Sequence, residues 1–374
     1  MKNLNFIAAV TLSVIICNQA YGSKEPVKKE VLGNHNGKEV YLFTLTNKNN
    51  NVLKVTNYGA KIVRIDVPDR NGERANVTLG AETFDGIIKG DMYGGTVVGR
   101  FANRIANGKF TLDGIEYNLP VNNRPNTLHG GRNGWFSKVW DAEIIEVGKS
   151  PAVKLSYNSP DMEEGFPGNV LIEVTYTWTD KNEIVIDYNA STDKKTVLNV
   201  TNHAYFNLRG AGNGYIFDHI MVLNSSSFTP FNAVKIPTGE IKSVKGTPFD
   251  FTSPMRIGEK IGETYENAIF DGYDHNFVLD NKKKVDASVY EPESGRVMQV
   301  ITDQPGMQFY SGSGAAWKKS VSSGTKPANT RSGFALETQH YPDSPNHPEF
   351  PSTILEPGKS FKSRTIYRFS VRNE

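Results

Sequence analysis

The 374-residue sequence contains one cysteine, Cys17, and it lies in the N-terminal segment. A single cysteine cannot form a disulfide within the chain, and removal of that segment would leave no thiol for a Cys/His catalytic pair. Stability must therefore come from a packed core, and a chain of this length can bury a large one.

The sequence also lacks a dominant charge. Forty-two Lys and Arg stand against forty Asp and Glu, a formal net charge of +2 at pH 7. This balance argues against a nucleic-acid-binding surface and against a polybasic membrane anchor. After the N-terminal segment, no stretch is long and apolar enough to predict a transmembrane helix.

The N-terminus has the pattern of a secretory signal peptide over residues 1–22. An apolar run extends from Phe6 to Cys17, and Ala20-Tyr21-Gly22 ends in small residues. A lipoprotein acylated at Cys17 is a weaker alternative, because Ile16 stands where a small residue would be needed. We therefore expect a secreted or periplasmic protein.

Helical periodicity is almost absent, and residues 254–261 alone could form one or two turns. Elsewhere apolar and polar residues alternate, and Asp113-Gly114 marks a tight hairpin. The predicted strands are 52–56, 61–67, 110–112, 115–119, 172–178, 183–188, 297–302, 308–311 and 365–371. Successive strands without intervening helices predict an all-β fold with antiparallel pairing, in a sandwich or barrel. No linker divides residues 23–374, so we expect one domain.

Several common catalytic signals are missing. Gly94-Gly95 lacks the spacing of a dinucleotide-binding loop, and no serine lies in a nucleophile elbow. None of the histidines has the short spacing of a zinc site. They are His35, His129, His203, His219, His275, His340 and His347. We expect neither a metal nor an organic cofactor.

Four groups of segments place ionisable or amide side chains beside aromatic residues and glycine. They are residues 99–110 with 126–131, residues 201–208, residues 273–277, and residues 333–339 with 308–310. Aromatic walls and amide, carboxylate, imidazole and guanidinium groups suit a sugar ring and its hydroxyls. Any one segment could instead hold a structural polar residue satisfied at a turn. The recurrence in four segments favours a sugar site.

These segments resemble the successive motifs of the aldose 1-epimerases, the galactose mutarotases. The most specific are Gly-Arg-Phe-Ala-Asn-Arg-Ile at 99–105 and Leu-His-Gly-Gly at 128–131, and the resemblance extends from about Leu32 to the C-terminus. It implies a large antiparallel β-sandwich with few short helices and a sugar cleft on one face.

The resemblance also implies roles for individual residues. Glu337 matches the general base and His203 the general acid, while Arg104 and His129 match residues that hold and polarise the sugar. Asp274 matches a carboxylate that accepts hydrogen bonds from sugar hydroxyls. The remaining implied sugar contacts are Asn103, Tyr205 and Gln308. The expected partner is a small aldose, bound by a monomer or a homodimer.

The chemistry of mutarotation requires such a pair. Opening the pyranose ring needs a base for the C1 hydroxyl proton and an acid for O5, and closing reverses the roles. On this hypothesis Glu337 is ionised and His203 protonated near neutral pH, with a nearby carboxylate favouring the charged imidazole.

Three alternatives remain open at this stage. Asp274 and Glu337 could be the two acids of a glycoside hydrolase. A non-catalytic carbohydrate-binding module would keep the sugar contacts without needing an acid and a base. A phosphosugar epimerase would need a cationic pocket, for which Arg100 and Arg132 are candidates, although each could equally be a solvated surface charge.

Overall fold

The computed structural model describes residues 25–90, 93–266, 268–280, 284–312, 322–323, 326–327 and 331–373. The predicted signal peptide, residues 1–22, lies outside the described residues. Among the residues described, no helix combines the length and the apolar character needed to cross a membrane.

The largest element is a nine-stranded antiparallel sheet in the order β12-β13-β14-β15-β33-β27-β26-β19-β22. Its strands, in chain order, are β12 (Asp141–Val147), β13 (Ser150–Ser159), β14 (Val170–Trp178), β15 (Glu183–Thr192), β19 (Ile220–Leu223), β22 (Met255–Arg256), β26 (Ala287–Tyr290), β27 (Arg296–Thr302) and β33 (Ser360–Val371).

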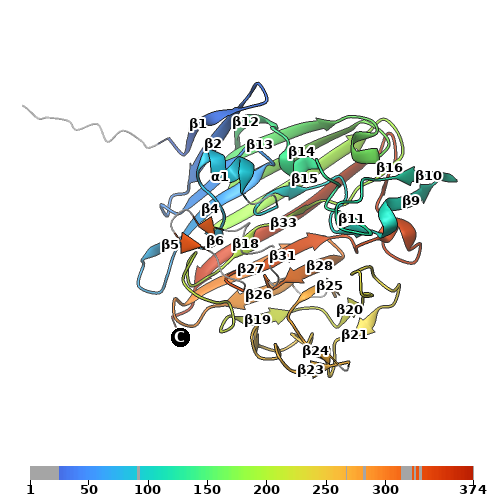
Figure 1. Cartoon of the computed structure of the whole chain (residues 1–374). Coiled ribbons are helices and arrows are strands. Elements are labelled where there is room, and N and C mark those ends of the chain that lie inside the picture. The colour runs from blue at the N-terminus through green and yellow to red at the C-terminus, as the bar shows by residue number, and fades with distance from the viewer. Residues whose placement is uncertain are drawn as a thin grey trace, which may run out of the picture.

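Two five-stranded antiparallel sheets accompany it, towards opposite ends of the molecule in Figure 1. The first contains β1 (Val27–His35), β2 (Lys38–Thr46), β3 (Val52–Thr56), β4 (Lys61–Pro68) and β5 (Arg74–Asn76). The second has the order β21-β20-β25-β28-β31. Its strands are β20 (Ser227–Thr229), β21 (Lys242–Ser243), β25 (Asp274–Val278), β28 (Gly306–Tyr310) and β31 (Ala335–Gln339).

Both smaller sheets cover the same face of the nine-stranded sheet. Trp178, Ile184 and Tyr367 lie opposite one another on β14, β15 and β33, so their side chains share a face. The Trp178 indole donates to the Asn51 carbonyl beside the first small sheet, and the Tyr367 hydroxyl donates to the Leu336 carbonyl of the second. The result is the large β-sandwich that the sequence predicts.

Short strands and turns connect these layers. They are β6 (Thr78–Leu79), β7 (Val97–Val98), β8 (Arg104–Ile105), β9 (Lys109–Leu112), β10 (Ile115–Asn118), β11 (Thr127–Leu128), β16 (Thr196–Val197), β17 (Thr201–Asn202), β18 (Tyr205–Phe206), β23 (Thr264–Tyr265), β24 (Ala268–Ile269), β29 (Ser322–Ser323), β30 (Lys326–Pro327) and β32 (Ile354–Leu355). Four single-turn 3₁₀ helices lie at Ala106–Gly108, Trp135–Ser137, Glu163–Gly165 and Ser344–Asn346.

The predicted strands and the Asp113-Gly114 hairpin are confirmed, and both turn residues adopt positive φ. The helical turns predicted over 254–261 are wrong, because β22 and turns occupy that segment. The single α-helix among the described residues, α1 (Phe84–Lys89), was not predicted. It has six residues and buries only Ile87, so its periodicity is too short to detect.

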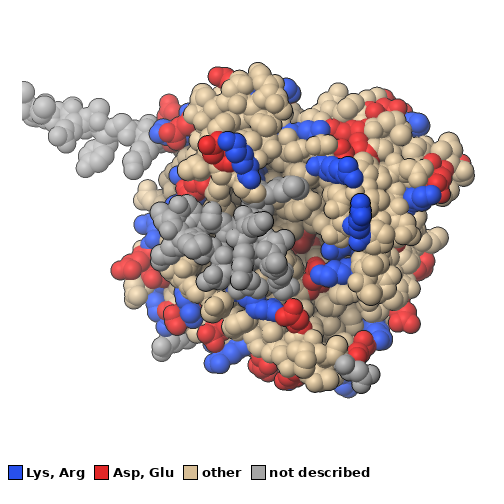
Figure 2. Space-filling model, in the orientation of Figure 1, with Lys and Arg blue, Asp and Glu red and all other residues tan. Residues whose placement is uncertain are grey.

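The face drawn in Figure 2 carries both signs of charge, and the Lys and Arg side chains are spread among Asp and Glu. No extended basic patch is visible on the described part of this face. This view agrees with the balanced charge of the sequence.

Candidate active site

Three neighbouring strands of the second small sheet carry the polar side chains of the site. Gln308 on β28 lies opposite Glu337 on β31, and also opposite Asn276 on β25, two residues after Asp274. Because side chains alternate along a strand, all four point to one face. The alternate residues Leu336, Phe309 and Met307 lie in the hydrophobic core. Because these apolar side chains must face the core, the polar side chains between them face away from it, into the site.

His203 reaches the same place from a different part of the sandwich. It follows β17 directly, and its backbone N–H donates to the Thr96 carbonyl at 2.9 Å. Tyr205 begins β18, and its ring centroid is 4.8 Å from that of His203. The imidazole Nε2 of His203 lies 3.5 Å from Oε1 of Glu337, so the two groups predicted as acid and base share one site.

Arg104 begins β8, and His129 directly follows β11, the strand that pairs with β8. Asn103 and His129 both adopt left-handed φ, and two hydrogen bonds join them. The His129 N–H donates to the Asn103 carbonyl at 2.9 Å, while the Asn103 N–H donates to Nδ1 of His129 at 3.2 Å. Because Nδ1 accepts a hydrogen bond, the proton of the neutral imidazole lies on Nε2. His129 therefore presents a donor to a sugar oxygen.

His129, His203 and Glu337 also form a possible metal-ligand set, with ligand atoms within 4.8 Å of one another. The tautomer of His129 opposes this use. Its Nδ1 lone pair is taken by the Asn103 amide and its Nε2 carries a proton, so neither nitrogen offers a free lone pair. The site chemistry fits sugar hydroxyls better than a cation.

The charge state of the pair differs from the sequence-based expectation. Burial lowers the pKa of His203 to about 4, and burial together with Asp274 raises the pKa of Glu337 well above its usual value. Two charges buried side by side cost more in desolvation than their attraction returns. Burial therefore favours the uncharged form of both groups, the neutral imidazole and the protonated carboxyl.

Two buried oxygens in the site lack a hydrogen-bond partner among the described residues. They are Oε2 of Glu337 and Oε1 of Gln308, and both residues are buried. A buried acceptor without a donor costs free energy unless a ligand or water supplies one. Both oxygens are therefore suited to accept hydrogen bonds from sugar hydroxyls.

Asp274 is held in place by its neighbours. Its Oδ1 accepts from Gln308 Nε2 at 2.8 Å, and its Oδ2 pairs with the Lys235 ammonium. Burial alone would raise the pKa of Asp274, but Lys235, Arg104 and these hydrogen bonds hold it below its usual value. Asp274 is thus an ionised acceptor beside a small hollow that Asn103 also lines.

All eight residues predicted for the site lie together, and three further residues join them. The Tyr93 ring lies 4.7 Å from that of His129 and 6.2 Å from that of His203, while Lys235 and Asn276 line the hollow beside Asp274. A single tyrosine or lysine in a loop carries no signal in the sequence. Asn276 could have been found, because it shares the strand alternation of Asp274.

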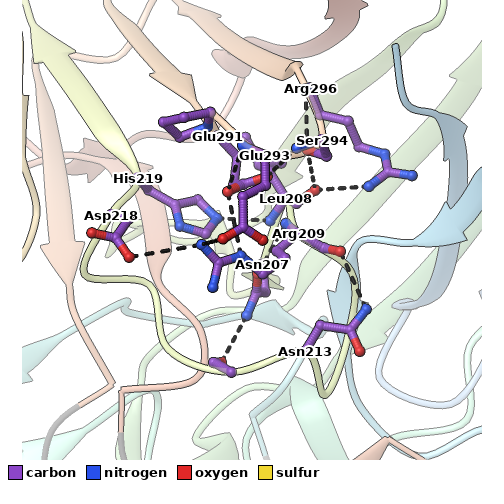
Figure 3. Close-up of polar contacts among 12 residues, drawn as sticks. Asn207, Leu208, Arg209, Asn213, Asp218, His219, Glu291, Glu293, Ser294 and Arg296 are labelled. Atoms are coloured by element: carbon purple, nitrogen blue, oxygen red, sulfur yellow. Dashed lines mark hydrogen bonds and ion pairs between the residues drawn. The ribbon is translucent and has the colours of Figure 1, made fainter. Parts of the chain in front are cut away.

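Part of the segment 201–208 is structural. The Leu208 N–H donates to Nε2 of His219 at 2.9 Å, and the Leu208 carbonyl accepts from Arg296 at 3.0 Å (Figure 3). Asn207 donates to the Ser332 carbonyl. These contacts anchor the chain that follows His203 and Tyr205.

Neither proposed phosphate residue lies in the site. Arg100 is 2% exposed and donates to the carbonyls of residues 159, 160 and 166–168, so it is not the solvated charge considered from the sequence. Arg132 is exposed and donates to the Val121 carbonyl. The Arg100 guanidinium instead satisfies backbone carbonyls of residues 159–168 that would otherwise be buried without a hydrogen bond.

Comparison with known proteins agrees with this geometry. Residues 41–368 match the family model described as aldose 1-epimerase. The chain belongs to the aldose 1-epimerase family. It is similar to galactose mutarotase of Bos taurus, with 43% identity over 324 residues, covering 85% of this chain and 91% of the relative. It is 35% identical to aldose 1-epimerase of Escherichia coli K12 over 338 residues, covering 89% and 96% of the two chains.

Solved structures of this family share the fold. A GalM/aldose epimerase homologue from C. elegans superposes with a TM-score of 0.81 and 30% identity, covering 89% of this chain and 99% of the homologue. Galactose 1-epimerase from Lactobacillus acidophilus gives a TM-score of 0.80 and 25% identity, covering 92% and 98%. Membership of the family makes the protein an isomerase that acts on sugars.

Proposed function

We propose that this aldose 1-epimerase interconverts the α and β anomers of free hexoses, with galactose and glucose as substrates. The observation that carries the proposal is the 3.5 Å approach of His203 Nε2 to Glu337 Oε1. O1 and O5 are bonded to the same hemiacetal carbon, so an adjacent acid and base can reach both oxygens.

One proton shared by the pair is sufficient for the reaction. Hydroxyl donation to the orphaned Oε2 of Glu337, together with the positive charge of Arg104, favours the ionised carboxylate when sugar is bound. The proton then lies on His203. Glu337 takes the O1 proton while His203 protonates O5, and the aldehyde forms after the C1–O5 bond breaks.

Ring closure uses the same groups in reverse. After rotation about C1–C2, His203 removes the proton from O5 as this oxygen attacks the other face of the aldehyde, and Glu337 returns a proton to O1. His129 donates through Nε2–H, and Arg104 adds positive charge, so negative charge on the sugar oxygens is stabilised. Asp274 and Gln308 fix the orientation of the ring.

Polarimetry tests this proposal directly. We expect the optical rotation of freshly dissolved α-galactose or α-glucose to reach its equilibrium value faster with the protein than without it, in proportion to protein concentration. An unchanged rate would contradict the proposal. Incubation with a disaccharide should release no reducing ends, since no observation in the site favours a glycoside hydrolase over an acid–base pair acting on a free sugar.

We also propose that the protein is exported and acts as a monomer or homodimer. The apolar run from Phe6 to Cys17 and the small residues before Ser23 support cleavage after Gly22. The intact mass of the protein purified from its native host should correspond to residues 23–374. Retention of residues 1–22, or a lipid mass on Cys17, would contradict this proposal.

A further inference from the structure

Lys235 is presented to the sugar site by a tightly closed loop. Its backbone adopts φ +60°, and its N–H donates to the Asn232 carbonyl at 2.8 Å. Asn232 Oδ1 accepts from the N–H groups of Val234 and Ile236. Asn126, three residues before His129, donates to the Val234 carbonyl at 2.9 Å. The backbone of this loop is therefore fixed to the chain that carries His129, and Lys235 extends from it to Asp274.

The ammonium group lies on the open side of Asp274. The side chain of Lys235 is 41% exposed and that of Asp274 is 17% exposed. A partly exposed ion pair contributes little to folding stability, and the long lysine side chain can redirect at low cost. A sugar hydroxyl that donates to Asp274 could at the same time accept from Lys235, because a hydroxyl is both donor and acceptor.

The strand order places this contact away from the reacting carbon. Asp274 is on β25 and Glu337 is on β31, with β28 between them. Neighbouring strands are about 4.8 Å apart, so the two carboxyl groups are separated by roughly the length of a hexose with its contacts. A sugar with C1 at Glu337 therefore presents the far end of its ring to Asp274 and Lys235.

Positive charge is in excess among the residues that line the hollow. Arg104 and Lys235 line the hollow together with a single carboxylate, Asp274. We propose that Lys235 is a specificity-determining residue that lets this site accept aldoses with an acidic group remote from C1, such as hexuronates. This inference rests on the proposed function and extends it to a second substrate class.

The experiment compares galacturonate with galactose as substrates of the full mature chain. Anomer exchange at equilibrium is measured by NMR, the spontaneous exchange of each sugar is subtracted, and kcat/KM is obtained for both. We expect wild-type protein to accelerate exchange of galacturonate. We expect K235M and K235Q to lower the galacturonate-to-galactose ratio of kcat/KM at least about tenfold, equivalent to ~1.4 kcal/mol. K235R should retain most of the ratio, because it keeps the charge.

A matched control is K242M. Lys242 is also a partly exposed lysine paired with a carboxylate, Glu266, and it does not line the hollow. Its replacement should leave the ratio unchanged. Raising the salt concentration from about 0.05 to about 0.5 M should lower the ratio for wild type more than for K235M, because salt screens the exposed charge.

The outcomes separate the two proposals. A wild-type protein that accelerates exchange of galactose but not of galacturonate overturns the inference about Lys235 and leaves the proposed function standing. If K235M and K235Q leave the galacturonate-to-galactose ratio of kcat/KM unchanged, the inference about Lys235 is likewise overturned and the proposed function stands. A protein inactive on both sugars overturns the proposed function itself.

Discussion

Two buried glutamates illustrate how surroundings decide what a carboxyl group does. Glu337 is 2% exposed and Glu291 is 0% exposed, and each lies near a buried histidine. Glu291 accepts hydrogen bonds from the N–H groups of Ser294 and Glu293 and pairs with Arg209 (Figure 3). Among the described residues, no backbone N–H donates to Glu337, and its Oε2 has no hydrogen-bond partner.

The difference appears in the direction of the two pKa shifts. Burial would raise the pKa of Glu291, but the hydrogen bonds from Ser294 and Glu293 outweigh it and the pKa is lowered. At Glu337 burial and Asp274 prevail, and the pKa is raised. A carboxyl group whose bonds are all made stabilises a loop, whereas one left unsatisfied is available to a substrate.

The largest expected effect is on catalysis at the site of Glu337. We expect His203→Asn to lower kcat/KM for galactose by roughly 10²–10⁴-fold, because a positioned acid or base contributes about that much. The double variant with Glu337→Gln should lose little more than the worse single variant, since groups that act as a unit are not additive. Polarimetric rates of the two single variants and the double variant test this. A loss in the double variant equal to the product of the two single losses would show that the two residues act independently.

A smaller effect is expected at Glu291, on stability. Glu291→Gln replaces one carboxylate oxygen by an amide N–H₂ that cannot accept from a backbone N–H, and it removes the charge that pairs with Arg209. We expect the free energy of unfolding to fall by about 1.5–3 kcal/mol. Urea denaturation measures this change. An equally stable variant would contradict the structural role of Glu291.

The pH dependence of activity should reveal the buried imidazole. The pKa of His203 is lowered to about 4, so its imidazole takes up a proton from solvent only near that pH. We expect kcat/KM to stay level through pH 6.5, the ordinary pKa of histidine, and to fall as the pH drops towards about 4. A fall centred near pH 6.5 would show a solvated His203. Circular dichroism at each pH separates inactivation from unfolding.

The smallest expected effects are on how the free energy of unfolding changes with pH. Glu337 and Glu291 should change it in opposite directions. The raised pKa of Glu337 means that the folded state binds more protons than the unfolded state above the unfolded pKa of 4.5, so Glu337 makes the protein less stable as pH rises. The lowered pKa of Glu291 gives stability that is present above pH 4.5 and is lost as pH falls below it.

Gln variants separate these two contributions. As the pH is raised from about 4.5 towards neutrality, Glu337→Gln should gain stability relative to wild type. Glu291→Gln should lose stability relative to wild type as the pH is raised through the range in which Glu291 ionises in the unfolded state. Urea denaturation at several pH values measures both differences. Slopes of the same sign would contradict the assigned pKa shifts.

The sequence predicted the sandwich and eight residues that the structure brings together, because their signals are local. Alternation along β25, β28 and β31 sets which side chains share a face, and the motifs at 99–105 and 128–131 identify the family. Lys235 was not predicted, since a lone lysine in a loop is typical of a solvated surface.

The charge state of the pair also could not be read from the sequence. A histidine near a carboxylate is ordinarily expected to be charged, but the depth of burial reverses this, and burial is a property of the assembled layers. The helix α1 escaped detection for a different reason, because one buried residue in six gives no period.

The most direct test compares Glu337→Gln with Glu291→Gln in a single polarimetric assay with α-galactose. Both changes are isosteric, and both replace a buried carboxyl group by an amide. We expect a loss of roughly 10²–10⁴-fold for Glu337→Gln and a rate within about twofold of wild type for the folded Glu291→Gln protein. A Glu337→Gln variant that anomerises galactose at the wild-type rate would contradict it.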